Sequence, residues 1–375
     1  MKGGLLSAAL IVKNEENFLG DCLASLRGIA NEVVVVDTGS TDRTKDIARN
    51  GGARVYDFPW NGDFSAARNR ALELSKGEWI LYIDADERVR SDAALDLRAE
   101  VSAPFLAGCR VLLHPLKGHT PYWCLRLWRN DPSIRFTGII HESTWPALHQ
   151  YCARSGRRVG FSRMMLDHEG YQENQHAKNA RNLPLLLKSL EQEPERIYCW
   201  CHLANIYMDM QERELAEEAW RKALAVIRKR GANSPEDILP YVGLIESSLK
   251  LGRDISALFT EAVSRFPFSV QLEWLRGQIL MHEGKFAEAI IAFEKLAARG
   301  QSGEIDHLAA YDLRMFDVFA YDAIATCHLR LGQYVESRRY YELAAEQQPD
   351  RLEYRVKQAL CSHLQLRAAG MNANA

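Results

Sequence analysis

The sequence predicts an α/β domain built on an open sheet, followed by an all-α region of stacked helix pairs. Short apolar runs at residues 5–12, 33–36 and 79–83 alternate with helix-like segments, and such runs are typical of strands buried on both faces. From residue 178 onward the pattern is helical throughout, and small and aromatic residues recur at fixed spacing. With 375 residues, the chain is long enough for two or three domains.

The first ninety residues alternate regularly between strand and helix. In chain order we expect a strand at 5–12, a helix at 17–28, a strand at 32–36, a helix ending at 51, a short strand from 55, a helix at 64–75 and a strand at 79–83. Glycines at the ends of these helices support the boundaries. The alternation predicts an open α/β sheet with right-handed crossovers.

The overall composition is that of an ordinary globular protein. Charged residues make up 26% of the chain and its net charge is −2, so nothing favours nucleic acid or an anionic membrane as a partner. No apolar run has the length of a transmembrane segment. Eight cysteines without a Cys-x-x-Cys pair indicate reduced thiols, and we therefore expect a cytoplasmic protein. We assign Cys199, Cys201 and His202 to packing within the helical region rather than to a metal site.

Carboxylates directly follow the apolar run at residues 79–83. Asp84 and Asp86 point the same way in an extended chain, because side chains alternate with a period of two. Ligands of open α/β sheets bind beyond the carboxyl ends of the strands, and paired carboxylate ligands suit Mg²⁺ or Mn²⁺ holding a phosphate. We interpret the pair as such a site. The alternative is an acidic turn that caps the next helix.

Two further polar residues, Asp37 and Arg68, have two interpretations each. Asp37 ends a strand, where an acid accepts hydrogen bonds either from a base or ribose or from the following turn, and its position alone favours neither. Arg68 follows the small residues 65–67 of a helix and could reach a phosphate as a forked donor, whereas an ordinary surface arginine is the alternative. No Gly-x-Gly-x-x-Gly or Walker sequence supports a dinucleotide or P-loop site.

Four motifs, taken together and in this order, resemble those of glycosyltransferase family 2. They lie at residues 11–16, 36–44, 63–69 and 83–87 and so cover about the first ninety residues. The resemblance implies the GT-A fold, a nucleotide-sugar donor, with a UDP-sugar expected, and inversion at the anomeric carbon. It also implies that Asp37 contacts the nucleobase, that Glu15 supports the nucleotide site and that Arg68 lies near the nucleotide. In the same way it makes Asp84 and Asp86 the metal motif: Asp86 is expected to hold Mn²⁺ or Mg²⁺, and Asp84 to bind the nucleotide sugar by assisting through the ribose or a water on the metal.

The segment 136–142 supplies a candidate catalytic base. It ends in His141 and Glu142 and follows an arginine-rich strand, an arrangement similar to the subgroup of lipopolysaccharide-type and sublancin-type S-glycosyltransferases. Inverting transfer needs a carboxylate that takes the acceptor proton, and Glu142 is our candidate. The alternative is that His141 and Glu142 only shape the cleft. The Glu-Asp pair that supplies the base in other family members is not evident.

His168 follows the last expected strand of the α/β domain, at residues 159–166. GT-A enzymes often supply a histidine from this end of the domain as a further metal ligand, and imidazole suits Mn²⁺ better than Mg²⁺. A structural histidine is the alternative. We therefore expect Asp86 and His168 as metal ligands, and we place the GT-A domain at residues 1–172.

The rest of the chain resembles an array of tetratricopeptide repeats. Small and aromatic residues recur at that spacing in four copies, of which those containing Trp200 and Ile324 are the clearest. We expect the repeats at residues 173–369, with an insertion at 300–317, and a disordered tail at 370–375. Such an array either binds an acceptor on its concave surface or pairs two copies of the enzyme as a homodimer, and the sequence does not choose between them.

These observations predict an inverting hexosyltransferase that uses a divalent cation and a peptide, protein or glycan acceptor. Two other classes remain open. An Asp-x-Asp phosphotransferase is disfavoured because no threonine stands two residues after Asp86. A non-catalytic repeat adaptor with a vestigial transferase domain is disfavoured by the intact Asp37, Arg68, Asp84 and Asp86.

Overall fold

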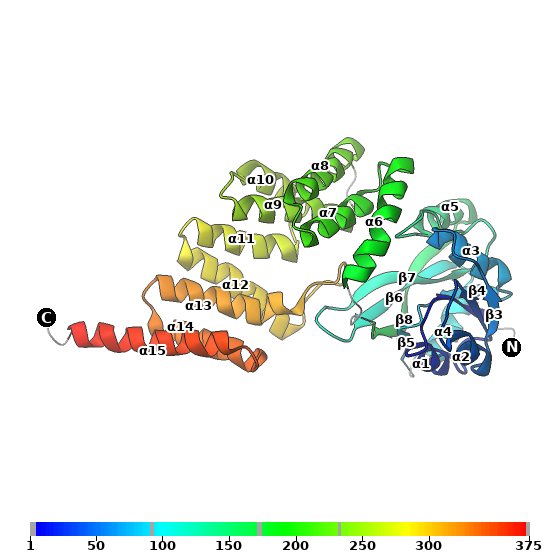
Figure 1. Ribbon diagram of the computed structural model, residues 1–375, viewed down its shortest axis with the longest axis horizontal. Helices are drawn as coiled ribbons and strands as arrows, with labels where there is room; N and C mark the ends of the chain where they lie inside the picture. The colour runs from blue at the N-terminus through cyan, green and yellow to red at the C-terminus, as the bar shows by residue number, and fades with distance from the viewer. Residues whose placement is uncertain (1–4, 91–93, 171–174, 232–233, 373–375) are drawn as a thin grey trace. The chain divides into compact units, whose positions relative to one another are not determined.

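The chain divides into two compact units in a computed structural model that describes residues 5–90, 94–170, 175–231 and 234–372. The first unit comprises Met1–Ile206 and the short segment His307–Ala310, and the second comprises Tyr207–Asp306 and Tyr311–Ala375. The first unit contains the sheet and the second is helical (Figure 1). The boundary expected at residue 172 falls outside the described residues and stays a prediction.

An eight-stranded mixed sheet, in the order β3-β2-β1-β4-β7-β6-β8-β5, organises the first unit. Its strands are β1 Leu6–Val12, β2 Glu32–Asp37, β3 Arg54–Asp57, β4 Trp79–Tyr82, β5 Glu87–Val89, β6 Leu106–Pro115, β7 Tyr122–Arg129 and β8 Arg158–His168. The first four strands are parallel, whereas β7 is antiparallel to both β4 and β6. The expected open α/β sheet is confirmed, and its second half is mixed.

Helices cover both faces of this sheet. They are α1 Leu19–Ser25, α2 Thr44–Asn50, α3 Phe64–Leu74, α4 Ala94–Ser102 and α5 Trp145–Ser155. Helices α6 Gln175–Gln192 and α7 Ile197–Asp209 follow them in the chain. Alternate strand residues enter two separate cores. Leu10 and Leu81 pack with α1, α2 and α4, whereas Ala9 and Ile80 pack with α3 and α5. The apolar runs are therefore buried on both faces, as their unbroken pattern predicts.

The carboxyl ends of the parallel strands meet at one edge of the sheet. Val12 at the end of β1 pairs with Asp37 at the end of β2, and Ala9 of β1 pairs with Tyr82 at the end of β4. The loops after β1 and β2 and the residues after β4 consequently share this edge, which is where open α/β sheets bind their ligands.

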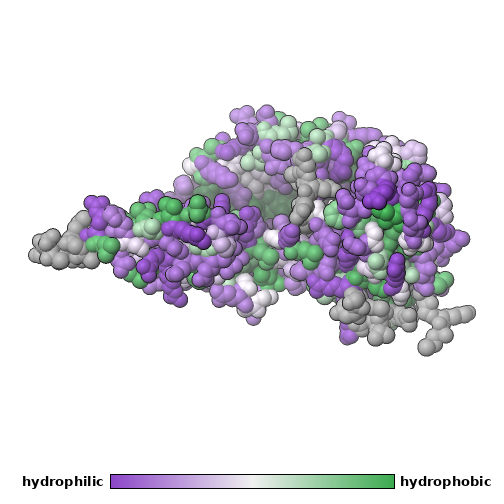
Figure 2. Space-filling view, turned by 60° about the horizontal axis from the view of Figure 1, so that its bottom comes forward, coloured by the Kyte–Doolittle hydropathy of each residue, from purple (hydrophilic) through white to green (hydrophobic). Residues whose placement is uncertain are grey.

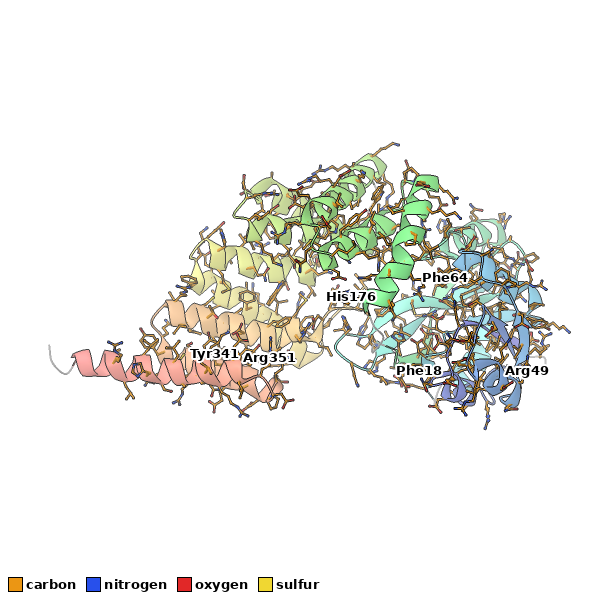
Figure 3. The ribbon with its side chains drawn as sticks, in the orientation of Figure 1. Phe18, Arg49, Phe64, His176, Tyr341 and Arg351 are labelled. Carbon is orange, nitrogen blue, oxygen red and sulfur yellow. The ribbon has the colours of Figure 1, made fainter. Side chains whose placement is uncertain are left out.

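The second unit is built from paired helices. They are α8 Arg213–Arg230, η1 Pro235–Ile238, α9 Leu239–Lys250, α10 Ser256–Arg265, α11 Val270–His282, α12 Phe286–Ser302, η2 Leu313–Phe316, α13 Val318–Arg330, α14 Tyr334–Gln347 and α15 Leu352–Asn372. Gly243 and Gly277 lie so close to the rings of Trp220 and Phe293 that an added Cβ would stand 2.3 and 2.5 Å from them. Tyr341 is likewise buried (Figure 3). Small residues thus let the helices touch while aromatic rings fill the gaps, as in the expected repeats.

One segment of the expected insertion at residues 300–317 belongs to the sheet unit. The carbonyl of His307 accepts a hydrogen bond from the amide of Trp123 (3.0 Å), and His307 Nδ1 lies 2.9 Å from the carbonyl of Pro121. The hydroxyl of Thr120 lies 3.4 Å from the carbonyl of Ala309. This segment therefore extends the hydrogen bonding at the start of β7.

The face drawn in Figure 2 is mainly hydrophilic, with apolar areas scattered over it. No helix in the described ranges combines the length and the apolar character needed to cross a bilayer. All eight cysteines are free thiols. Helix α15 ends at Asn372, and the last residues of the tail expected at 370–375 lie outside the described chain.

Candidate active site

A cluster of charged side chains lies just beyond the end of β4. Arg68, in the second turn of α3, donates a hydrogen bond from Nη2 to Asp84 Oδ1 (3.2 Å) and another from Nε to Glu142. The Glu142 side chain is only 9% exposed. The structure thus brings together Arg68, Asp84 and Glu142, which the sequence analysis selected from three separate segments.

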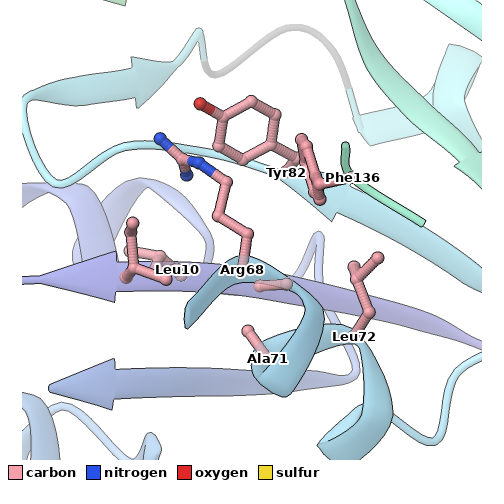
Figure 4. A pocket seen from close by; sticks show the side chains of 8 residues that line it. Leu10, Arg68, Ala71, Leu72, Tyr82 and Phe136 are labelled. Carbon is pink, nitrogen blue, oxygen red and sulfur yellow. The ribbon is translucent and has the colours of Figure 1, made fainter. Parts of the chain in front are cut away.

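Local sequence explains why Arg68 reaches this position. Asp63 caps α3, because its carboxylate accepts a hydrogen bond from the amide of Ala66 (3.2 Å). Ser65 and Ala67 are small and buried, so this end of the helix lies close to the sheet. Arg68 then extends along the end of β4, where its guanidinium lies beside the ring of Tyr82 (Figure 4).

Tyr82, the last residue of β4, contacts two guanidinium groups. Arg68 and Arg126 each lie 4.2 Å from the centroid of its ring, a distance typical of cation–π interactions. Arg126 also forms an ion pair with Glu87 and lies 3.5 Å from Asp84 Oδ2. Burial alone would raise the pKa of Asp84, but Arg68 and Arg126 hold it below its ordinary value. The carboxylate of Asp84 therefore stays ionised at neutral pH.

Three residues of this cluster were not selected from the sequence: Tyr82, Glu87 and Arg126. Burial raises the pKa of Glu87 to about 7, against the opposing effect of Arg126. Arg126 reaches the site because β7 is antiparallel to β4 with Leu127 opposite Leu81, which places Arg126 next to Tyr82. The available signal was the position of Arg126 between Leu125 and Leu127 in a mostly apolar segment, since a charge that becomes buried there needs a partner.

A second group joins Asp86 to the end of β8. His168 Nε2 lies 3.1 Å from Asp86 Oδ2, and the pairing of Glu87 with His168 between β5 and β8 brings them together. The next residues enclose Asp86 further. The amide of Glu169 donates to its carbonyl (2.9 Å), and an added Cβ on Gly170 would stand 1.7 Å from its Oδ2. Burial would lower the pKa of His168, but the hydrogen bond with Asp86 raises it.

Asp86 and His168 have the chemistry of a partial metal site. They place a carboxylate oxygen and an imidazole nitrogen side by side, and both side chains are partly exposed. In the part of the chain that the structure describes, no group of three or more histidine, cysteine, aspartate or glutamate side chains is arranged to hold a metal ion. Mg²⁺ is often bound by one or two carboxylates, with substrate phosphates and water completing the shell. The two residues fit a cation that is bound together with a phosphate.

Asp37 and Glu15 belong to a separate network at the ends of β2 and β1. Asp37 is 1% exposed, and its Oδ1 accepts hydrogen bonds from the amides of Gly39 (3.0 Å) and Ser40 (2.9 Å). Its Oδ2 is buried and has no hydrogen-bond partner within the described residues, which is the arrangement expected of an atom that meets a ligand. The amide of Glu15 donates to the hydroxyl of Thr44 (2.7 Å) and so ties the loop after β1 to α2.

The turn that carries Glu142, at residues 137–143, is closed by two backbone hydrogen bonds of 3.1 Å. The first turn of α3 supports it twice. The hydroxyl of Ser65 donates to the carbonyl of Gly138 (2.6 Å), and the amide of Phe64 donates to the carbonyl of Ile139 (2.9 Å). Because the same helix carries Arg68, it positions both partners of the ion pair between Arg68 and Glu142.

Comparison with known proteins finds related chains, among them the following three. The lipopolysaccharide core biosynthesis glycosyltransferase LpsC of Rhizobium meliloti is 34% identical over 190 residues, which are 46% of this chain and 68% of LpsC. The SPbeta prophage-derived glycosyltransferase SunS of Bacillus subtilis is 30% identical over 205 residues, 51% of this chain and 46% of SunS. A TPR repeat-containing protein of Synechococcus elongatus is 32% identical over 251 residues, 64% of this chain and 61% of that protein.

The chain therefore spans about half the length of the last two relatives, and two thirds of LpsC. The family model described as glycosyl transferase family 2 matches residues 7–161, which include all the predicted site residues except His168. Tetratricopeptide repeat models match residues 197–229 and 256–304, as the helical spacing predicts. These matches confirm the resemblance found in the sequence: the chain belongs to glycosyltransferase family 2.

Proposed function

We propose that this chain is an inverting, metal-dependent glycosyltransferase. It moves a hexose from a nucleoside-diphosphate sugar, with UDP as the expected nucleotide, to a peptide, protein or glycan acceptor. The observation that carries the proposal is the cluster in which Arg68 bridges Asp84 and Glu142. Asp86, two residues after Asp84, pairs with His168. The name of the relative LpsC, which refers to lipopolysaccharide core biosynthesis, supports a glycan among the candidate acceptors.

Each predicted residue other than Glu142 has a part at the donor site. Asp37 would receive a hydrogen bond from the nucleobase at its buried Oδ2, while its other oxygen holds the turn after β2. Glu15 would support the same end of the donor from the loop after β1. Asp86 and His168 would hold the divalent cation, which when bound offsets negative charge on the leaving diphosphate. Arg68 adds a fixed positive charge beside them, and Asp84 holds Arg68 in place.

Glu142 would act on the acceptor. Arg68 engages Glu142 Oε1 through its Nε, so the second carboxylate oxygen serves as the base. It accepts the proton of an acceptor hydroxyl or thiol while the acceptor atom bonds to the anomeric carbon and the bond to the diphosphate breaks. A single displacement of this kind inverts the anomeric configuration.

A panel of nucleotide sugars tests this function. We expect one donor, together with Mn²⁺ or Mg²⁺, to raise the melting temperature and to be hydrolysed slowly to sugar and nucleoside diphosphate, because transferases leak sugar to water. Chelation of the cation should stop the release. Direct release of inorganic phosphate would contradict the proposal in favour of a phosphotransferase, and a chain that neither binds nor hydrolyses any donor would be an adaptor.

Gly170→Ala is expected to weaken Mn²⁺ binding in the presence of nucleotide by about 10- to 100-fold. The new methyl group would stand 1.7 Å from Asp86 Oδ2, so the carboxylate must turn away from His168. The measurement is a Mn²⁺ titration of nucleoside diphosphate release. Gly20→Ala is the matched control, because the nearest atom to its new Cβ is an ordinary 3.8 Å away. Equal Mn²⁺ dependence in the two variants would show that Asp86 is not a ligand.

A further inference from the structure

Arg196 lies in the short connection between α6 and α7, 54 positions beyond Glu142 in the sequence, and is nevertheless bonded to the turn that carries it. Its Nη1 donates to the carbonyl of Ile140 (3.1 Å) and its Nη2 to the carbonyl of His141 (2.7 Å). The Arg196 side chain is 20% exposed, so these bonds are largely shielded from water. A guanidinium that bonds two adjacent carbonyls fixes the orientation of both peptide groups.

Together, Arg196 and the first turn of α3 engage four consecutive carbonyls of the turn, at residues 138–141. Gly138 is required at the start of this run. Its φ is +96°, and an added Cβ would stand 2.0 Å from Arg196 Nη1, so a side chain here would displace the guanidinium. Glu142 is the next residue after the four carbonyls, and the direction of its side chain depends on them.

His141 forms a second contact between this turn and α7. It has a positive φ of 52°, which is uncommon for a residue other than glycine. Its ring lies 4.0 Å from that of His202 and 5.0 Å from that of Tyr198, measured between centroids. Burial lowers the pKa of His141 to about 3 and that of His202 to about 4. Both rings are therefore neutral at physiological pH and pack without charge repulsion.

We propose that Arg196 is a positioning residue for Glu142, so that the connection between α6 and α7 is part of the catalytic unit. The inference rests on the proposed role of Glu142 as the base. Arg196 acts through the backbone of the turn: it holds the peptide groups before Glu142 at the angle from which that carboxylate meets Arg68 and the acceptor. A shift of about 1 Å in such a group can cost on the order of 100-fold in rate.

Arg196→Ala tests the proposal through the kinetics of nucleoside diphosphate release. We expect kcat to fall by about 10- to 100-fold, while the KM for the donor stays within about twofold, because Asp37, Asp86 and His168 lie on other segments of the sheet unit and Asp84 still holds Arg68. Arg196→Lys keeps a cation that reaches one carbonyl and should recover part of kcat. Glu193→Gln is the control: the exposed Glu193 pairs with Arg196 at 3.5 Å, and its loss leaves both carbonyl bonds in place. An unchanged kcat in Arg196→Ala overturns the proposal.

A double variant separates positioning from general loss of stability. If Arg196 acts through Glu142, adding Arg196→Ala to Glu142→Gln should cause little further loss. Losses that multiply would show a general destabilisation and would overturn the proposal.

Hydrogen exchange supplies a readout that needs no substrate. The amides of residues 137–143 should exchange faster in Arg196→Ala than in the native chain, while those of β1 and β4 stay protected. Unchanged exchange at 137–143 overturns the inference whatever the activity. If the native chain hydrolyses no donor, the proposed function fails, and the exchange result alone then decides whether Arg196 holds the turn.

Discussion

Replacing Asp86 by asparagine is expected to lower sugar transfer and donor hydrolysis by about a thousandfold without unfolding the chain. The amide keeps the shape of the carboxylate and its hydrogen bond with His168, but it lacks the negative charge that holds a divalent cation. Metal ions contribute several kcal/mol to the stabilisation of developing charge, and about 4 kcal/mol corresponds to a thousandfold change in rate. Initial rates over a range of Mn²⁺ and Mg²⁺ concentrations measure the effect.

Asp57→Asn is the matched control for this variant. Asp57 ends the parallel strand β3, and its side chain is exposed and pairs with Lys45 at the surface. We expect this control to retain its rate, and both variants to keep the melting temperature of the native chain. Near-normal turnover of Asp86→Asn at ordinary metal concentrations would remove Asp86 from the metal site.

Glu142→Gln is expected to lower kcat by about 100- to 10,000-fold with little change in donor affinity. Glutamine retains an oxygen that can accept the hydrogen bond from Arg68 Nε, so the side chain can keep its position beside Arg68. It cannot take up a proton at neutral pH, and the acceptor therefore stays protonated as the new bond forms. Turnover of the donor, with water or an acceptor as nucleophile, measures the loss, and a thermal shift with the donor measures binding.

Glu73→Gln serves as the control, because the Glu73 side chain is exposed and pairs with Arg70 on the same helix. It should leave both kcat and the thermal shift unchanged. If Glu142→Gln also kept near-native turnover, Glu142 would only shape the cleft, and the base would have to be sought elsewhere.

The architecture of the sheet unit was predictable because its signals are local. An apolar run such as 79–83 needs burial on both faces, and glycines end the helices between such runs. Local signals of the same kind selected Asp37, which ends β2, and Asp84, which follows the end of β4 at the same edge of the sheet. The antiparallel insertion of β7 beside β4 was not predictable in this way, since strand order depends on pairing between distant segments.

In the site as well, contacts between distant segments were not predictable from local signals. Arg126 reaches Tyr82 through the register of β7, and Arg196 reaches the Glu142 turn from the connection between α6 and α7, which no motif in the sequence singles out. His202 was assigned to packing within the helical region, but its ring packs against His141 in the turn that carries Glu142. Sequence spacing reveals which face of a helix is buried without revealing what covers it. The roles given to individual site residues remain predictions for the variants above.

The segment His307–Ala310 has a consequence for the order in which this protein is made. Its hydrogen bonds to Thr120 and Pro121 join residues 189 and 186 positions apart. A chain that emerges from the ribosome forms β1 to β8 long before this segment has been synthesised, and domains generally fold in that order during synthesis. The sheet unit therefore completes its hydrogen bonding only after about a hundred residues of helical repeats have followed it, so a nascent chain stopped before residue 307 carries an unfinished edge at the start of β7.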